Sequence, residues 1–336
     1  MNLRTLWVML PASLAGTVAA ANLYNGTPTP IKEPACIADP DPAFVLDQPA
    51  PEDRYILVVR HMDSDALSTK PSYDYGALGE QPLTGFHPDV PRDFWQRAKA
   101  DVDANYSSAF QLQCADAGMF INTWRFEPQT LIDEGPHAAY TYAFSDWPPI
   151  YDGNPDTDFV LQASLEVPWL YRPAGEAIAQ IYFQARFFDA SSGKPLQMTL
   201  LVFANEGIAY SPYVDYARND SLFVSAPLTT TAIATRSPYS YGATAEPWTG
   251  LRFFRAQITP ANFGAAVALV NQFCARRPDI PDCAIPPGRD LALSRDPADY
   301  RLIEFSVITE VFNADTGRNG MSVGMHLQSL GAFTFR

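Results

Sequence analysis

Polar side chains alternate with apolar ones along residues 179–189, and this run carries the groups best suited to chemistry in the sequence. Because successive side chains of a strand point to opposite faces, the polar ones share the face opposite the core. They are Gln180, Tyr182, Gln184 and Arg186. Amides and a guanidinium hold hydroxyl groups by directed hydrogen bonds, and a tyrosine ring offers a flat apolar surface. The pattern therefore favours a site for a sugar polymer.

The same alternation places polar residues of other predicted strands opposite their core side. They include Trp124, Gln162, Glu166 and His326. If these strands lie in one sheet, all of the side chains line one surface, and we predict a glycan groove there. The alternative is an ordinary solvated face, because an antiparallel sheet with one wet side usually carries polar residues on it.

Two glutamates of the segment 301–312, Glu304 and Glu310, share this face by parity. Their separation along the strand is about 20 Å. Glycosidase carboxylates stand ~5.5 Å apart for retention and ~6.5 to 9.5 Å apart for inversion, so these two cannot form the catalytic pair. The predicted pair is Glu310 with Glu166 on a neighbouring strand. The alternative is that each glutamate is solvated or forms a salt bridge with Arg186.

His326 gives a second enzymatic hypothesis. Together with Tyr182, Gln184 and Arg186 it resembles the set that jelly-roll polysaccharide lyases use. In such a site Arg and Gln neutralise a uronate carboxylate, while His or Tyr moves the proton. The alternative is a hydrogen-bonded histidine of an ordinary sheet, and the acidic composition of the chain counts against a polyanionic substrate.

One Asp-rich loop has oxygen ligands at alternate positions, a spacing that calcium sites use because the oxygens can then surround one ion. They belong to Asp152, Asn154, Asp156 and Asp158. Thr157 stands where an EF-hand has its glycine, and Ala163 where it has its bidentate glutamate. The loop predicts at most a structural calcium ion, with a plain acidic turn as the alternative. The predicted chemistry requires no cofactor.

Short strands separated by Gly, Pro and Asp turns must position these residues. We predict strands at 55–59, 119–126, 137–145, 158–167, 179–189, 196–204, 222–226, 250–258, 301–312 and 320–335. Helices are predicted over 91–105 and 260–273, and each begins with a proline, which helices tolerate in their first turn. Many short strands with one or two short helices predict an all-β fold, a jelly roll or β sandwich, with a single domain over residues 55–336.

This layout resembles the concanavalin A-like jelly-roll group of lectins, glucanases and polysaccharide lyases. The resemblance covers the strand order and the polar sheet face of residues 119–336. It implies a curved sheet whose concave face holds a glycan. The Glu-x-Asp-x-x-Glu pattern of the retaining glucanases is absent. The leading hypothesis is a glycoside hydrolase acting on a polysaccharide, and the alternatives are a polysaccharide lyase and a non-catalytic glycan-binding or surface interaction protein.

The amino-terminal residues predict export. Residues 1–21 begin with a charged stretch, continue with an apolar run and end in Ala19-Ala20-Ala21, which is the order of a cleaved signal peptide. The apolar run is too short to span a bilayer. Residues 22–54 are rich in Pro, Ala and Asp and predict an extended lead-in. We therefore expect a secreted protein, extracellular or periplasmic, without membrane insertion.

Charge and cysteine content narrow the partners and the covalent structure. A formal net charge of −14 argues against nucleic acid and anionic membranes, because both need a basic footprint. Four cysteines in an exported chain predict two disulfides, for which three pairings exist. Cys274 and Cys283 enclose a Pro-rich loop and form the natural local pair, which leaves Cys36 with Cys114.

Overall fold

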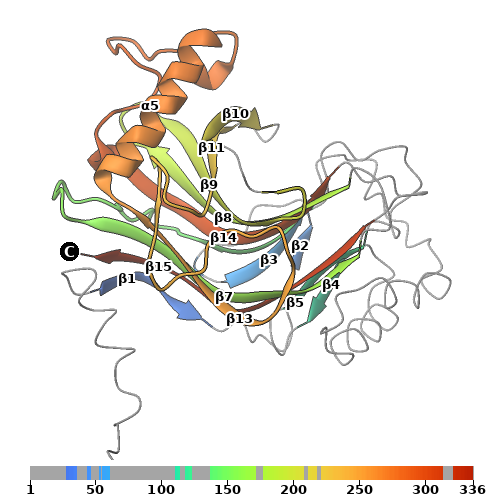
Figure 1. Ribbon diagram of the computed structural model, residues 1–336. Coiled ribbons are helices and arrows are strands. Elements are labelled where there is room, and N and C mark those ends of the chain that lie inside the picture. The colour runs from blue at the N-terminus through green and yellow to red at the C-terminus, as the bar shows by residue number, and fades with distance from the viewer. Residues whose placement is uncertain are drawn as a thin grey trace, which may run out of the picture.

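The protein is a two-layer β sandwich in a computed structural model (Figure 1). The structure describes residues 28–35, 44–46, 53, 55–60, 110–113, 118–122, 137–171, 177–207, 211–217, 221–312 and 321–335. Over these residues one sheet, sheet A, has seven strands and the other, sheet B, has eight. The predicted all-β sandwich is confirmed.

Sheet A runs in the order β12 (Thr235–Arg236), β13 (Trp248–Ile258), β7 (Asp158–Tyr171), β15 (Ser322–Phe335), β5 (Gly118–Asn122) and β4 (Phe110–Gln113), and β1 (Pro28–Ala35) also pairs with β15. Sheet B runs in the order β10 (Tyr213–Ala217), β11 (Ser221–Pro227), β9 (Lys194–Ala204), β8 (Ile178–Asp189), β14 (Tyr300–Phe312), β6 (His137–Ala143), β3 (Tyr55–Arg60) and β2 (Phe44–Leu46). Neighbours are antiparallel except β9 with β11 and β2 with β3.

The core lies between the sheets and follows the alternation predicted from the sequence. The inward side chains of β8 are fully buried: Ile181, Phe183, Ala185 and Phe187. They belong to one apolar cluster with inward residues of sheet A, such as Leu161 on β7 and Met325 on β15. Burial of each large apolar side chain stabilises the fold by roughly 1.5–3 kcal/mol, which fixes the face that every strand presents outward.

The predicted strands 179–189 and 196–204 are β8 and β9, which form an antiparallel hairpin with Asp189 opposite Lys194 in register. The Gly193 amide donates to the Asp189 carbonyl at 2.8 Å. Gly193 has a φ of 74°, a left-handed conformation that a side chain disfavours. The turn therefore ends at the one residue type that tolerates its backbone.

One long helix, α5 (Pro260–Arg276), packs against the sandwich at one end (Figure 1). Thr259 caps it, because its hydroxyl accepts from the Asn262 amide at 3.0 Å, and Pro260 begins the first turn. The predicted disulfide between Cys274 and Cys283 is confirmed and joins the end of α5 to the short 3₁₀ helix η2 (Pro281–Cys283). A second 3₁₀ helix, η3 (Pro297–Asp299), precedes β14.

The structure contains short strands that were not predicted from the sequence. The lead-in over residues 22–54 contains β1 in sheet A and β2 in sheet B. The prolines of β1 argue against a strand in the sequence, because proline cannot donate a backbone hydrogen bond. The pairing of β1 with β15 accommodates them through two register shifts. The predicted signal segment, the predicted helix over 91–105 and the pair Cys36 and Cys114 lie outside the described residues. No helix in the described part of the chain is long and apolar enough to cross a membrane.

Candidate functional site

The polar residues predicted to share one surface are divided between the outer faces of two sheets. Gln180, Tyr182, Gln184 and Arg186 lie on the outer face of sheet B, alternating with the core residues of β8. Gln162, Glu166 and His326 lie on strands β7 and β15, on the outer face of sheet A. Trp124 lies outside the described residues. The alternation of side chains tells which face of a strand a residue lies on, but not which sheet the strand belongs to. The sequence prediction therefore placed residues of sheet A and sheet B on one surface.

This division separates the two glutamates of the predicted catalytic pair. Glu310 is on β14 in sheet B, and Glu166 is on β7 in sheet A. They point away from the core on opposite sides of the sandwich, so they do not stand opposite each other on neighbouring strands. The lyase set is separated in the same way, because His326 lies on the side of Glu166 while Tyr182 and Arg186 lie on the side of Glu310.

The outer face of sheet B is concave, since both sheets curve in the same sense and sheet A lies on the convex side (Figure 1). A row of polar residues crosses this face from strand to strand. In register order its members are Thr141, Ser306, Gln184, Thr199, Ser225 and Tyr213. We call this surface the B face and these residues the polar row. At ~4.8 Å per strand the polar row is about 24 Å long, which suits an extended polymer.

Most of the polar row is screened from solvent although it points away from the core. Ser306 is 1% exposed, Thr141 4% and Ser225 6%. Polar groups in such surroundings interact strongly, because the local dielectric constant is low, and they are costly when left without a partner. An ordinary solvated sheet face would leave these hydroxyls open to water.

Three buried polar atoms of the B face have no hydrogen-bond partner within the described structure: Arg186 Nε, Gln197 Oε1 and Ser306 Oγ. They are neighbours, since Gln197 stands opposite Arg186 and Ser306 stands opposite Gln184 in register. An unsatisfied buried group costs about 1–3 kcal/mol, and folded proteins rarely leave one without a reason. Three such atoms in one patch make it the candidate binding surface of the B face.

The patch carries little net charge. Arg186 Nη1 lies 3.9 Å from Glu304 Oε1, and the two side chains are only 25% and 10% exposed. The guanidinium is thereby balanced by a carboxylate on the neighbouring strand. The patch thus offers directed hydrogen bonds without an excess of positive charge, which suits neutral hydroxyl groups better than a carboxylate ligand.

Glu310 lies beside this patch in a cluster with two tyrosines. The Tyr182 hydroxyl donates to Glu310 Oε2 at 2.9 Å. Burial, followed by the charge of Glu310, raises the pKa of Tyr182 well above its ordinary value. Burial likewise raises the pKa of Tyr213, with Glu310 and Glu206 adding to the effect. Both phenols therefore stay protonated, and Tyr182 remains a fixed donor to Glu310.

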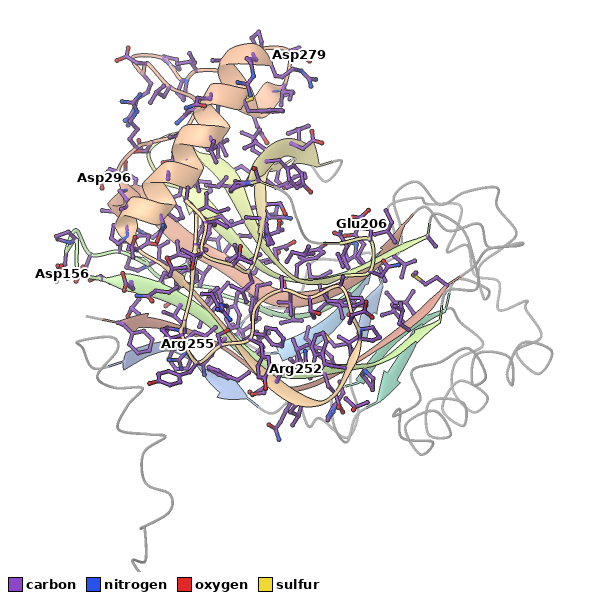
Figure 2. The ribbon with its side chains drawn as sticks, viewed as in Figure 1. Asp156, Glu206, Arg252, Arg255, Asp279 and Asp296 are labelled. Carbon is purple, nitrogen blue, oxygen red and sulfur yellow. A yellow bond between two sulfur atoms is a disulfide. The ribbon has the colours of Figure 1, made fainter. Side chains whose placement is uncertain are left out.

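A second carboxylate reaches the same end of the B face from the turn after β9. Gln180 Nε2 donates to Glu206 Oε1 at 3.2 Å, and Gln180 stands opposite Glu310 in register. Figure 2 shows Glu206 above sheet B, at the end far from helix α5. We call Gln180, Tyr182, Glu206, Tyr213 and Glu310 the Glu310 cluster. The strand pattern does not reveal Glu206, because this residue follows the end of β9, where the alternation of side chains no longer applies.

On the outer face of sheet A, Glu166 links three adjacent strands. Its Oε1 lies 3.0 Å from His326 Nδ1 on β15, and its Oε2 accepts from the Gly250 amide on β13. Gly250 has a φ of 80° and lies where the register of β13 shifts. The hydrogen bond with His326 is the main cause that lowers the pKa of Glu166, the Gly250 amide adds to it, and partial burial opposes it.

This lowered pKa predicts a loss of stability in acid. A carboxyl whose pKa is lower in the folded state stabilises the fold above its unfolded pKa, near 4.5, and the contribution is lost as the pH falls through the folded value. Glu166→Gln should therefore lower the free energy of unfolding at neutral pH and have a smaller effect at pH values below that range. Urea denaturation across the pH range measures this. An equal destabilisation at all pH values would contradict the charged interaction.

The predicted calcium loop is an exposed turn whose oxygens accept hydrogen bonds from the loop itself. Asp152 Oδ1 accepts from the Asn154 amide at 3.0 Å and from the Thr157 hydroxyl at 2.9 Å. Asn154 Oδ1 accepts from the Asp156 amide at 2.9 Å. Asp158 accepts from Gln257, and burial is the main cause that raises its pKa. Calcium binding by this loop stays a prediction.

No protein-family model and no curated protein matches the sequence. Similar solved structures include the family 11 xylanase from Neocallimastix patriciarum, with 8% identity, 67% of this chain and 84% of that chain covered, and a TM-score of 0.32. A family 12 xyloglucanase from Bacillus licheniformis in complex with ligand has 8% identity and a TM-score of 0.30, with 67% of this chain and 84% of that chain covered. The xyloglucanase domain of NopAA from Sinorhizobium fredii in complex with cellobiose has 12% identity and a TM-score of 0.26, with 63% of this chain and 82% of that chain covered. Likeness at these scores carries no argument about this chain, whose fold and site rest on its own residues.

Proposed function

We propose that this protein is an exported glycoside hydrolase that binds a neutral polysaccharide along the polar row of the B face. The observation that carries the proposal is the patch of three buried, unsatisfied atoms on Arg186, Gln197 and Ser306. A donor, an acceptor and a hydroxyl that can do both match the hydroxyl groups of a sugar. Glu206 and Glu310, held at one end of this face by an amide and a phenol, would repel the carboxylate of a uronate, which favours a neutral substrate.

The Glu310 cluster supplies the carboxylates for hydrolysis. Gln180 and Tyr182, which hold Glu206 and Glu310, are two positions apart on β8, about 7 Å along the strand. Both carboxylates therefore lie over the same end of β8, and we propose that they stand at the ~6.5 to 9.5 Å that inverting glycosidases use. One carboxylate would take a proton from the attacking water while the other protonates the leaving oxygen. Glu206 thus replaces Glu166 as the proposed partner of Glu310, and no cofactor takes part.

Tyr213 has a further role in this proposal. It ends the polar row next to Glu310 and remains 47% exposed, although the lower part of its ring packs against Phe223. An exposed aromatic ring at the edge of a polar site offers a stacking surface for a sugar ring. The sugar that stacks there would place its glycosidic bond over the Glu310 cluster.

Binding assays on a polysaccharide panel test the substrate class. The panel contains neutral glucans, xylans and mannans beside acidic polyuronides. Hydrolysis is read from new reducing ends, and β-elimination from the absorbance of an unsaturated product. We expect new reducing ends with a neutral polymer. A protein that acts only on polyuronides, or releases unsaturated products, contradicts the proposal.

Substitutions in the polar row test the site itself. Gln184→Ala and Ser306→Ala should each weaken binding of the active polymer roughly tenfold, because each removes about one net hydrogen bond or more. The matched control is Gln328→Ala, which truncates an exposed side chain on β15 in sheet A. Affinity electrophoresis or calorimetry measures the change. If Gln184→Ala and Ser306→Ala bind the polymer like the parent and like the control, the B face is not the binding surface.

A further inference from the structure

A separate hollow of about 400 Å³ lies at the end of the sandwich near helix α5, between the β8–β9 turn and the segment before η3. Its volume is within the range of small-ligand sites, ~300–1,000 Å³. The polar residues that line it are Ser191, Ser192, Arg289, Asp290, Ser294 and Arg295. None of them belongs to the polar row or to the Glu310 cluster.

One buried carboxylate joins the two walls of this hollow. Asp189 is 0% exposed, and its Oδ1 accepts from the Ser191 and Ser192 amides at 2.9 and 3.2 Å. Its Oδ2 accepts from the Ser192 hydroxyl at 2.6 Å and from the Ser294 amide at 2.7 Å. Residues 191–192 and residue 294 are thereby held against each other although they are distant in sequence. The hollow is therefore preformed.

The loop that completes the hollow is also fixed at its start. The disulfide of Cys283 ties it to α5, and Lys194 donates to the carbonyls of Asp282 and Ala284. Arg289 Nη2 then donates to the Ser191 carbonyl at 3.3 Å, which brings the loop back to the β8–β9 turn. A site whose walls are set before binding loses little entropy on binding.

Two guanidinium groups face this hollow without a carboxylate partner among the described residues. Arg289 contacts only a backbone carbonyl, and Arg295 has no hydrogen bond or ion pair there. Their charges stand out in a chain with a formal net charge of −14. At physiological salt the field of distant charges is screened beyond ~8 Å, so the charges at the hollow itself decide which ligand is attracted. The carboxylate of Asp189 is already engaged by backbone amides, which leaves the two arginines and Asp290 to face a ligand. Arginine is the side chain that binds carboxylate and phosphate oxygens with paired hydrogen bonds.

We propose that this hollow binds a small oxyanion that also carries hydroxyl groups, a sugar acid or sugar phosphate. Arg289 and Arg295 hold the anionic oxygens. The Ser191 hydroxyl, which has no partner in the described structure, and the Asp290 carboxylate bind the hydroxyl groups of the ligand. Along β14 the ten positions from Tyr300 to Glu310 span about 33 Å, so this site is distinct from the Glu310 cluster. Figure 2 shows the same separation: Asp296, in the segment next to the hollow, lies beside α5, and Glu206 lies at the end of sheet B far from α5.

Calorimetric titration of the full-length exported protein tests this site, at constant ionic strength, with four probes: glucuronate, glucose 6-phosphate, inorganic phosphate and glucose. We expect binding of the two sugar anions, at least ~tenfold weaker binding of inorganic phosphate, and none of glucose. If inorganic phosphate binds as tightly as the sugar anions, the hydroxyl contacts are wrong. If no anion binds, the site itself is wrong.

Paired substitutions locate the binding. Arg289→Gln with Arg295→Gln should weaken glucuronate binding at least ~tenfold, while Arg289→Lys with Arg295→Lys should restore part of it. Arg276→Gln is the control, because it removes a positive charge from the end of α5 without touching the hollow. All of these arginines are exposed, so the variants should keep the melting temperature of the parent. Equal loss in the control variant, or none in the paired variant, overturns the assignment. Hydrolysis of a neutral polymer should continue in the paired variant, which separates this result from a failure of the proposed function.

Discussion

Glu310→Gln should reduce the turnover of the neutral polysaccharide by ~10²- to 10⁴-fold while leaving its binding nearly unchanged. The substitution keeps the shape of the side chain and an oxygen that accepts from Tyr182, but the amide cannot transfer a proton. Glu206→Gln should have an effect of similar size, because inversion needs both an acid and a base. Initial rates of reducing-end release, compared with binding constants, measure the two effects separately.

The control is Asp279→Asn, which makes the same kind of change, carboxylate to amide, at an exposed residue beyond the end of α5 and far from Glu206 (Figure 2). It should leave both turnover and binding unchanged. If Glu310→Gln turns over substrate like the parent, Glu310 is not catalytic. If the parent binds neutral polymers without cleaving any, the B face belongs to a binding protein, and the glutamates only support the ligand.

Phe263→Ala should lower the free energy of unfolding by about 3–5 kcal/mol. Phe263 is 0% exposed, and its ring contacts Tyr300, Phe187 and Tyr151 at centroid distances of 4.6, 5.1 and 5.5 Å. These contacts fix helix α5 to the sandwich, so the truncation leaves a cavity that rigid neighbours cannot fill. Urea denaturation measures the loss.

Phe273→Ala on the same helix provides the control for that experiment. Phe273 is only partly buried, so the same change of residue should cost clearly less. If the two substitutions cost the same, the aromatic contacts of Phe263 add nothing beyond ordinary helix packing. A far smaller loss than expected for Phe263→Ala would indicate that the helix is not firmly attached.

Sequence alternation predicted the long strands and the face of each residue because both depend on local geometry. Gln184 and Phe183 illustrate this, since neighbours in the chain went to opposite faces as expected. The assignment of strands to sheets depends on contacts between distant segments, and alternation contains no information about it. Glu166 and Glu310 were paired for that reason, although β7 and β14 lie in different sheets.

Tyr213 and the hollow near α5 were not predicted either, because the strand pattern around them is weak or they depend on contacts between distant segments. Tyr213 lies on the edge strand β10, which is too short and too polar for its pattern to stand out. The hollow near Arg289 and Arg295 is formed by a loop that meets a turn about a hundred positions away. A disulfide could be predicted there, because the spacing of Cys274 and Cys283 is local.

Strand β15, near the end of the chain, lies inside sheet A between β7 on one side and β1 and β5 on the other. Its partners are made long before it, so none of them can complete sheet A until residues 322–335 have left the ribosome. Sheet formation of this kind depends on contacts of high sequence separation and is slow. At roughly 5–20 residues per second, synthesis leaves the edge of β7 that pairs with β15 without its partner for many seconds. During that time the unpaired edge of β7 is open to pairing with another chain, so correct folding depends on how well that edge is protected until β15 arrives.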